Sequence, residues 1–292
     1  MPLVSVIIPS YNRKELLVRA IRSVLIQDLS DMELVVVDDG STDATPSLAM
    51  EFSDPRLKWV HQSNAGVTAA RNTGASVSTG DYLIFLDSDD ELLQGYLKEF
   101  YELSQESPDL IFFGAEILAG SQNRTLIKAT EPYGVPSTDG LFLAGTFAIR
   151  RSIFDRSGGY DEKLAYGENT ELSFRLNPIS LKRIFIDEPL LRINQMASRD
   201  SVAPHKIRAS ISHMLIKHRE FFSRHPHILF LYLRNLGVAC LRLRLSAEAR
   251  AHFFTAWKMR PLFWKAAFRL ALSCSPGKVY GRFYPPPSST AR

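Results

Sequence analysis

The stretch "DYLIFLDSDDE", residues 81–91, passes from an apolar run to a cluster of acids within a few residues. Residues 82–86 are a short apolar run of the kind that forms a buried strand. In an extended segment, Asp87 and Asp89 lie on the same side of the chain. Two neighbouring carboxylates repel each other unless a cation neutralises them, and Mg²⁺ or Mn²⁺ binds such carboxylates together with phosphate oxygens. The stretch therefore predicts a site for Mn²⁺ or Mg²⁺ and a diphosphate, with Asp87 and Asp89 as ligands.

The acids of this stretch also have a purely structural explanation. Acidic side chains often cap helices, and a helix could begin near Glu91. We predict that Asp90 is such a cap, whereas Asp87 and Asp89 together form the ligand site.

The first 200 residues alternate strand and helix patterns, which predicts an α/β fold with a mostly parallel sheet and helices on both faces. The expected strands are "LVSVII", "MELVVV", "RLKWVH", "DYLIFL" and "DLIFFG". The helices expected between them are "RKELLVRAIRSVLIQ", "STDATPSLAMEF" and "GVTAARNTGASVS".

The loops after the strands carry the candidate binding residues, because ligands of parallel sheets bind at the carboxyl ends of the strands. The first strand is followed by Pro9, Ser10, Tyr11 and Asn12, and the second by "DDGSTDAT". Later residues of that loop suffice to cap a helix, so we expect Asp39 to be free to accept hydrogen bonds from a base or ribose. No G-x-G-x-x-G or G-x-x-x-x-G-K-[ST] motif occurs, which disfavours dinucleotide and P-loop folds.

Charge divides the 292 residues into two parts. Residues 1–200 hold 19 Lys and Arg against 29 Asp and Glu, and residues 201–292 hold 16 against 2. Residues 204–274 look helical throughout, and the Pro-rich end should be disordered. We expect an α/β domain over residues 1–200 and a basic helical extension with a disordered tail over residues 201–292, without an internal repeat.

No signal peptide or transmembrane helix is expected, since Pro9 interrupts the first apolar run and Arg234 the last. Cys240 and Cys274 match no metal or redox spacing and are expected to be buried, reduced thiols of a cytoplasmic protein.

Four motifs, "VSVIIPSYNR", "VVVDDGSTD", "NAGVTAARNTG" and "DYLIFLDSDD", occur in the order and spacing of the family 2 glycosyltransferases with the GT-A fold. The later segment "FAIRRSIFDRSGGYDEKLAYGENTELSFRL" is similar to the acceptor side of that family. The resemblance implies a Rossmann-like sheet and a transferase that moves a sugar from a nucleotide-diphosphate sugar to an acceptor hydroxyl. It also implies inversion, Mn²⁺ or Mg²⁺, and a role in cell-surface polysaccharide or glycan synthesis.

The resemblance assigns roles to individual residues. Asp39 would hydrogen-bond the base with Arg71 nearby, Asp87 would contact the ribose, and Asp89 would bind the metal. The remaining assignments border the nucleotide sugar (Pro9, Tyr11, Asn12, Ser88) or the acceptor (Gly159, Tyr160, Asp161).

The catalytic base departs from the family pattern. Where the family has a box of the type E-D-x-[DE], this chain has Glu168, Asn169, Thr170 and Glu171, and an amide at Asn169 accepts no proton at neutral pH. Three explanations stay open: Glu168 is the base, which is our leading hypothesis; Glu171 is the base; or the protein binds a nucleotide sugar without turning it over. The last would make it a weak or inactive partner in a glycan assembly complex.

In residues 201–292, basic residues alternate with aromatic ones, for example Arg250, Phe253, Trp257 and Lys258. The aromatic residues could pack the helices together, leaving the basic residues in solvent. Alternatively, the segment could contact an anionic membrane from the cytoplasmic side, close to a glycan or lipid-linked acceptor. Binding of nucleic acid is not expected, since no nucleic-acid-binding motif accompanies the charge.

Overall fold

The computed structural model describes residues 2–119, 123–129, 142–195, 203–262 and 264–274. The chain divides into two compact units, the first made of residues 1–133, 137–162 and 168–199, and the second of residues 134–136, 163–167 and 200–292. The tail expected to be disordered lies outside the described residues. Within the described part of the chain, every helix is too short or too polar to cross a bilayer.

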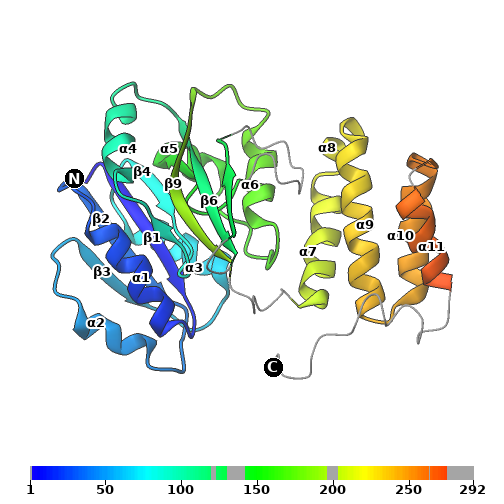
Figure 1. Ribbon diagram of the computed structural model, residues 1–292, viewed down its shortest axis with the longest axis horizontal. Coiled ribbons are helices and arrows are strands. Elements are labelled where there is room, and N and C mark those ends of the chain that lie inside the picture. Colours follow the sequence, from blue (N-terminus) through cyan, green and yellow to red (C-terminus); the bar gives the residue numbers. More distant parts are fainter. Residues whose placement is uncertain (1, 120–122, 130–141, 196–202, 263, 275–292) are drawn as a thin grey trace. The chain divides into compact units, whose positions relative to one another are not determined.

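The first unit is built on one nine-stranded sheet (Figure 1). Its strands are β1 (Val4–Ser10), β2 (Met32–Asp38), β3 (Leu57–His61), β4 (Tyr82–Phe85), β5 (Glu91–Leu92), β6 (Leu110–Ala119), β7 (Asn123–Ile127), β8 (Phe147–Arg150) and β9 (Arg183–Gln195). The order is β3-β2-β1-β4-β8-β6-β9-β5, with β7 paired to β6. The five predicted apolar runs therefore all form strands of this sheet.

The sheet is parallel only in part. Strands β3, β2, β1 and β4 run parallel, as do β6 and β9, whereas β8, β7 and β5 pair antiparallel to their neighbours. The α/β fold class is confirmed, but the sheet is more mixed than predicted. Parallel neighbours need crossover helices, and the regular alternation of strand and helix stops after β4.

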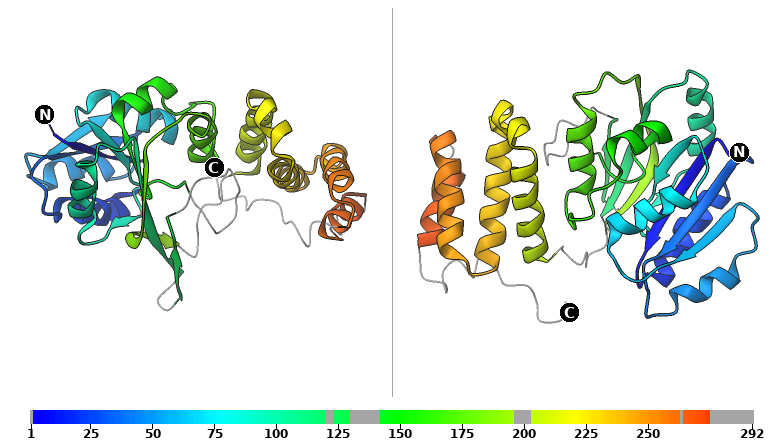
Figure 2. Two further views of the ribbon diagram at one scale, coloured as in Figure 1. Left: turned by 90° about the horizontal axis from the view of Figure 1, so that it is seen from above. Right: turned by 180° about the vertical axis from the view of Figure 1, so that it is seen from behind.

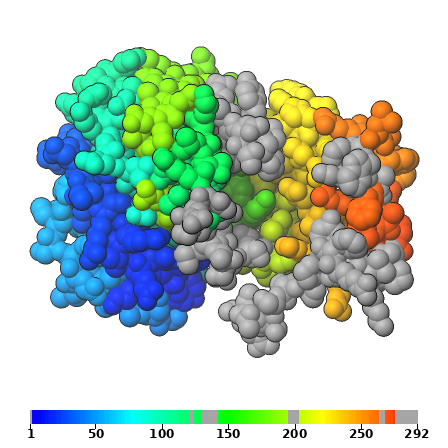
Figure 3. Space-filling model, viewed as in Figure 1, coloured from blue at the N-terminus to red at the C-terminus, as the bar shows by residue number. Residues whose placement is uncertain are grey.

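Helices cover both faces of the sheet (Figure 2). They are α1 (Lys14–Leu25), the short η1 (Thr45–Ser47) and α2 (Leu48–Glu51), α3 (Val67–Val77), α4 (Tyr96–Ser104), α5 (Arg151–Ser157) and α6 (Glu168–Leu176). Side chains alternate between the faces of a strand: Val6 and Ile8 of β1 belong to the core beneath α1, α2 and α4, and Ile7 to the core beneath α3, α5 and α6. In the space-filling view, the blue surface of α1 hides the strands behind it (Figure 3).

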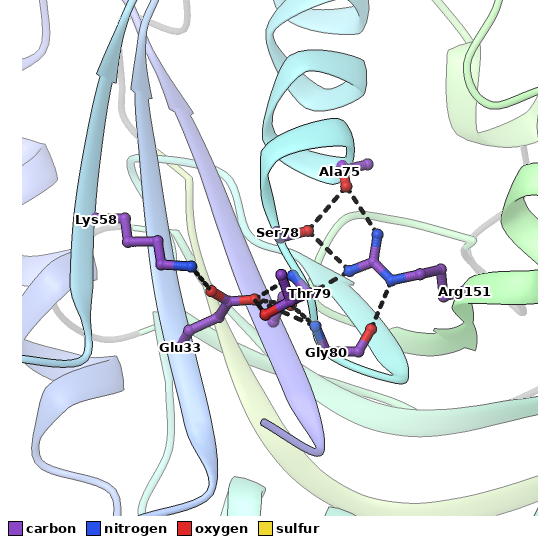
Figure 4. Close-up of polar contacts among 8 residues, drawn as sticks. Glu33, Lys58, Ala75, Ser78, Thr79, Gly80 and Arg151 are labelled. Atoms are coloured by element: carbon purple, nitrogen blue, oxygen red, sulfur yellow. Dashed lines mark hydrogen bonds and ion pairs between the residues drawn. The ribbon is translucent and has the colours of Figure 1, made fainter. Parts of the chain in front are cut away.

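A polar network ties the amino ends of the central strands together, opposite to the carboxyl ends that ligands of such sheets use (Figure 4). Glu33 of β2 is 4% exposed and accepts hydrogen bonds from the Ser5 hydroxyl at 2.7 Å and from the backbone of Thr79 and Gly80. The Lys58 ammonium lies 2.5 Å from its second oxygen. Arg151 donates to the carbonyl oxygens of Ala75 and Gly80 and to the Ser78 hydroxyl. The network fixes the turn that leads from α3 into β4.

Between residues 203 and 274, the described part of the second unit consists of helices and the short turns between them. Its helices are α7 (Pro204–Lys217), α8 (Arg219–Arg224), α9 (Pro226–Arg242), α10 (Ser246–Met259) and α11 (Trp264–Cys274). Several of its aromatic side chains are buried between these helices, among them Phe222, Phe230 and Phe253. Cys240 is buried as predicted, but Cys274 is exposed, so the prediction of two buried thiols is wrong for Cys274.

Candidate active site

A cavity of about 300 Å³ opens at the carboxyl ends of β1, β2 and β4. Its lining comes from the loop after β1, from Asp39, from α3 and from the acidic stretch after β4: Pro9, Ser10, Tyr11, Arg13, Asp39, Val67, Ala70, Asp87, Ser88 and Asp89. The chain after β1 leads to β2, toward one edge of the sheet, whereas the chain after β4 leads to β5, at the other edge. The strand order therefore reverses between β1 and β4, which is where ligands of such sheets bind. The Ser10 hydroxyl is buried and has no hydrogen-bond partner among the described residues, so the wall holds an unused polar group.

Asp39 shapes the floor of this cavity. Its carboxylate accepts hydrogen bonds from Gln62 Nε2 at 2.7 Å, from the backbone N–H of Ala65 at 2.9 Å and from that of Gly66 at 2.8 Å. An ionised carboxylate has about four acceptor positions, so the chain itself occupies most of them. The carboxylate thus fixes the loop that leads into α3. Asp39 also lines the cavity, and its contact with a base or ribose stays a prediction.

The loop after β1 is held by Asn12, which has a positive φ of 52°. Its side-chain oxygen accepts hydrogen bonds from the backbone N–H of Thr42 at 2.7 Å and of Asp43 at 3.2 Å, while its own N–H donates to Ser41 Oγ. Asn12 thus joins the loops after β1 and β2, which leaves its neighbour Tyr11 on the cavity wall, 45% exposed.

Three carboxylates gather after β4. Oxygen atoms of Asp87, Asp89 and Asp90 lie within 4.8 Å of one another, a set of hard oxygen donors that suits Mg²⁺ or Mn²⁺. Asp90 is buried and its Oδ1 accepts the backbone N–H of Asn194 in β9 at 2.9 Å. The predicted helix cap at Asp90 is wrong, because Glu91 begins the short strand β5, which pairs with β9.

Arg71 of α3 lies behind the cavity wall. The side chain is 1% exposed and donates to Asp87 Oδ1 at 2.6 Å and to Glu168 Oε1 at 2.8 Å, with its guanidinium 5.2 Å from the centre of the Tyr160 ring. Burial alone would lower the pKa of Arg71, but the charges of Asp87 and Glu168 raise it above its ordinary value. The terminal nitrogens of Arg71 are thus bound to carboxylates, and its expected contact with the nucleotide sugar stays a prediction.

In the segment "GENTEL", the side chains of Glu168 and Asn169 are joined to Tyr160 by a series of hydrogen bonds. The Tyr160 hydroxyl donates to Asn169 Oδ1 at 2.8 Å, and Asn169 Nδ2 donates to Glu168 Oε1 at 3.1 Å. Asn169 is 7% exposed, and burial raises the pKa of Tyr160 so that its phenol stays protonated. Asn169 therefore orients the carboxylate of Glu168.

Glu171 points elsewhere. It is fully buried and forms a bidentate ion pair with Arg175, one helical turn later, with Arg175 Nη2 at 2.7 Å from Oε2 and Nε at 3.0 Å from Oε1. Arg175 also donates to the Ser157 carbonyl oxygen. The alternative of Glu171 as the base is therefore wrong, since its carboxylate stabilises the packing of α6.

The acceptor-side residues predicted around Gly159 are held by Asn72, which the sequence reasoning missed. Asn72 Oδ1 accepts the N–H of Tyr160 at 2.9 Å, and its Nδ2 donates to the Tyr160 carbonyl oxygen at 2.9 Å. Gly159 has a φ of +69°, and a Cβ there would lie 2.9 Å from Asn72 Oδ1, so only glycine fits. Asp161, the residue after Tyr160, is half-buried. The signal that could have found Asn72 is its place beside Arg71 in the motif "ARN".

Comparisons with known proteins identify the family. The model of glycosyl transferase family 2 matches residues 5–160, just over half of the chain. Among curated relatives, glycosyltransferase GlyA of Streptococcus pneumoniae is 38% identical over 40% of this chain and 16% of its own length. The GalNAc(5)-diNAcBac-PP-undecaprenol beta-1,3-glucosyltransferase of Campylobacter jejuni is 38% identical over 38% of either chain. The chain thus spans well under two thirds of these relatives.

A solved structure resembles the fold over nearly its whole length. S. aureus TarS 1-349 in complex with UDP-GlcNAc shares a TM-score of 0.60 at 20% identity, covering 94% of this chain and 89% of that one. This likeness confirms the predicted GT-A fold, with helices following the sheet domain. The match of the family model shows that the chain belongs to glycosyltransferase family 2.

Proposed function

We propose that the protein transfers a sugar from a nucleotide-diphosphate sugar to an acceptor hydroxyl, with inversion at the sugar carbon and with help from Mn²⁺ or Mg²⁺. We assign this chemistry to residues 1–200. The nucleotide would lie in the cavity lined by Pro9, Tyr11 and Asp39, and the diphosphate beside Asp87 and Ser88.

The observation that carries this proposal is the position of Arg71. One buried guanidinium binds Asp87 at the acidic edge of the cavity and Glu168 at the start of α6. Arg71 therefore bridges a carboxylate that we assign to the donor side and a carboxylate that we assign to the acceptor side, and it fixes their separation. A reaction between two bound molecules needs such fixed mutual placement of the groups that contact them.

Asp89 and Asp87 would hold the metal ion. When bound, the ion would neutralise the charge that develops on the leaving diphosphate. Asp87 Oδ1 accepts a hydrogen bond from Arg71 at 2.6 Å, so Oδ2 would be the atom that binds the metal ion. Asp90 supports the cluster through its bond to β9 rather than through the ligand.

Glu168 is the group that we propose as general base. Its side chain is 15% exposed, and Arg71 and Asn169 both bind its Oε1. The same two contacts fix the carboxylate while leaving Oε2 to accept the proton of the acceptor hydroxyl.

The acceptor that we propose is a glycan or lipid-linked sugar in polysaccharide biosynthesis. The Campylobacter jejuni relative acts, by its name, on an undecaprenol-linked saccharide, and a relative from Escherichia coli, 37% identical over 36% of this chain, is named as a putative colanic acid biosynthesis enzyme. Such an acceptor would bring a cytoplasmic protein to the inner face of a membrane. The UDP-GlcNAc in the TarS complex makes UDP-sugars the first donors to test.

A second function, binding of the nucleotide sugar without turnover, is favoured by one observation. Both polar atoms of the Asn169 amide are bound to Tyr160 and Glu168, and an amide takes up no proton at neutral pH. The residue at the usual position of the base thus has a structural role. Turnover then depends on Glu168 alone.

The test is nucleoside diphosphate release from UDP-, GDP- and dTDP-sugars, with and without Mn²⁺, in the presence of glycan and lipid-linked acceptor mixtures. We expect metal-dependent release, lost by more than a hundredfold in Asp89→Asn and Glu168→Gln. Glu102→Gln, which changes an exposed carboxylate on α4, is the matched control and should behave as the wild type. Metal-dependent binding of a sugar nucleotide without release under any acceptor mixture would favour the second function, and no binding at all would refute both.

A further inference from the structure

Helices α9 and α10 carry a spacing that the sequence reading passed over. Their sequence follows the tetratricopeptide repeat pattern, W-x2-L-G-x2-Y…A-x3-F…P. The matching residues are Leu233-x2-Leu236-Gly237-x2-Cys240, then Ala249-x3-Phe253, then Pro261. Leu233 and Cys240 replace the two aromatic residues of the pattern. The expectation of no internal repeat needs correction on this ground.

The packing agrees with the spacing. Ala249, Phe253 and Ala256 of α10 are fully buried, as is Cys240 of α9. A Cβ on Gly237 would lie 2.6 Å from Phe253 Cε1, so the glycine allows the phenylalanine ring to sit directly on α9. The two helices are one repeat hairpin, which packs on α7 on one side and on α11 on the other.

Helix α11 repeats the pattern of α9 thirty-four residues later, the period of such repeats. Leu270, Ala271 and Cys274 stand at the places of Leu236, Gly237 and Cys240. In α9 these positions are buried under α10, whereas in α11 Leu270 is half-buried and both Ala271 and Cys274 are exposed.

The sequence after α11 does not repeat α10. Phe283, Pro287 and Thr290 stand where the pattern of α10 has Ala249, Phe253 and Ala256. Helix α11 thus matches the first helix of a repeat, whereas the pattern of the second helix does not recur in residues 283–290. Its Leu270–Cys274 face is the one that α10 covers in the preceding hairpin.

We infer that this face of α11, defined by Leu270, Ala271 and Cys274, binds an acidic amphipathic helix of another protein, which takes the place that α10 takes on α9. The helix that covers this face in the preceding hairpin indicates what the bound helix should look like. It should carry small residues on either side of an aromatic residue, as in Ala249-x3-Phe253-x2-Ala256.

Charge decides between the occupants of such a helical face. Residues 201–292 hold 16 Lys and Arg against 2 Asp and Glu, and both acids are paired within the unit, Glu248 with Arg208 and Glu220 with Arg224. A second copy would bring two strongly positive units together, whereas an acidic helix is attracted. An anionic membrane would also be attracted, and Phe254 and Phe268 are exposed while Phe253 is buried. The counterpart of this face in α9 is covered by a helix, which favours a helix as the occupant.

The probe for this surface is a fluorescein-labelled peptide of residues 246–259 in which Arg250 and Lys258 are replaced by glutamate. It keeps the alanine and phenylalanine positions of α10 and carries an acidic outer face. Binding of this peptide to the 292-residue protein is measured by fluorescence anisotropy at about 0.15 M salt. The rate at which a maleimide modifies the exposed thiol of Cys274 gives a second readout.

We expect saturable binding that slows modification of Cys274 and is weakened at least tenfold by Ala271→Arg. The matched control is Ala251→Arg, which adds the same charge and volume on the exposed surface of α10 and should change the affinity less than twofold. Because Ala271→Arg adds positive charge, attraction alone would leave binding unchanged or stronger. A peptide with Phe253 also replaced by glutamate should not bind.

Three results would overturn the inference. Equal peptide affinities of Ala271→Arg and Ala251→Arg would show that the binding depends on net charge and not on this face of α11. Sedimentation that shows a dimer dissociated by Ala271→Arg would assign the face to a second copy. Co-sedimentation with anionic phosphatidylglycerol vesicles that Ala271→Arg abolishes, with no peptide binding, would assign it to a membrane.

Discussion

Replacing Glu33 by glutamine should destabilise the first unit at neutral pH and make its stability less dependent on acid. Burial alone would raise the pKa of Glu33, but hydrogen bonds from Lys58, from the Thr79 backbone and from Ser5 lower it from 4.5 to about 2. A lowered carboxylate pKa means that the folded state holds the ionised form more tightly than the unfolded chain does.

The size of the effect follows from this difference in pKa. A change from 4.5 to about 2 corresponds to about 3 kcal/mol. Solvent around the half-exposed Lys58 side chain screens part of it, so we expect Glu33→Gln to lower the free energy of unfolding by about 2 kcal/mol at pH 7. Because the folded pKa is lowered, this stabilisation is complete above about pH 4.5 and is lost as the pH falls toward about 2, with more than half gone at about pH 3.

The assay is urea unfolding followed by the fluorescence of Trp59, in a chain where Trp257 and Trp264 are replaced by phenylalanine so that only the first unit reports. The difference between wild type and Glu33→Gln is measured from pH 7 down to about 3. Glu51→Gln breaks an exposed ion pair with Lys14 and serves as the control, with no measurable change expected. A difference that stays constant with pH, or a variant as stable as the wild type, would refute the reasoning.

Three further substitutions test other contacts. Gly237→Ala should lower the free energy of unfolding of the second unit by about 1–3 kcal/mol, seen in thermal melts of Trp257 fluorescence, since the added methyl meets the Phe253 ring at 2.6 Å. Asn72→Ala should raise the acceptor KM about tenfold and leave the affinity for the sugar nucleotide unchanged, because it releases the backbone of Tyr160. Glu171→Gln should lower the melting temperature through loss of a buried ion pair, costing about 3 kcal/mol, and leave the pH profile of turnover unchanged; a shifted profile would return Glu171 to the reaction.

The layout of the fold could be predicted because it depends on local pattern. A continuous apolar run such as "MELVVV" is typical of a parallel strand that is buried on both faces. The helical spacing of Leu17, Ile21 and Val24 correctly indicates the buried face of α1. The cavity followed from these elements, since the residues after parallel strands meet at one edge. Pro9, Asp39, Asp87 and Asp89 all line it.

The roles of single carboxylates could not be predicted in the same way, because each depends on a partner far away in the sequence. Asp90 accepts a hydrogen bond from Asn194, a hundred and four residues later, and no local signal distinguishes that from a helix cap. Arg71 is ninety-seven residues from Glu168. The local sequence around an arginine does not show whether it is buried. A buried guanidinium needs carboxylates around it to offset the loss of water, and these carboxylates lie elsewhere in the sequence.

Helix α3 connects the proposed donor and acceptor sides of the site. Asp39 holds the backbone of Gly66, the residue before the helix, so the floor of the cavity sets where α3 begins. One turn further, Arg71 and Asn72 are adjacent in sequence, and they bind Glu168 and Tyr160 on the acceptor side. Because an α-helix is stiff over this length, a change in the Asp39 loop moves both contacts at once. The carboxylate that we propose as the base is therefore positioned by the same loop that lines the cavity proposed for the nucleotide.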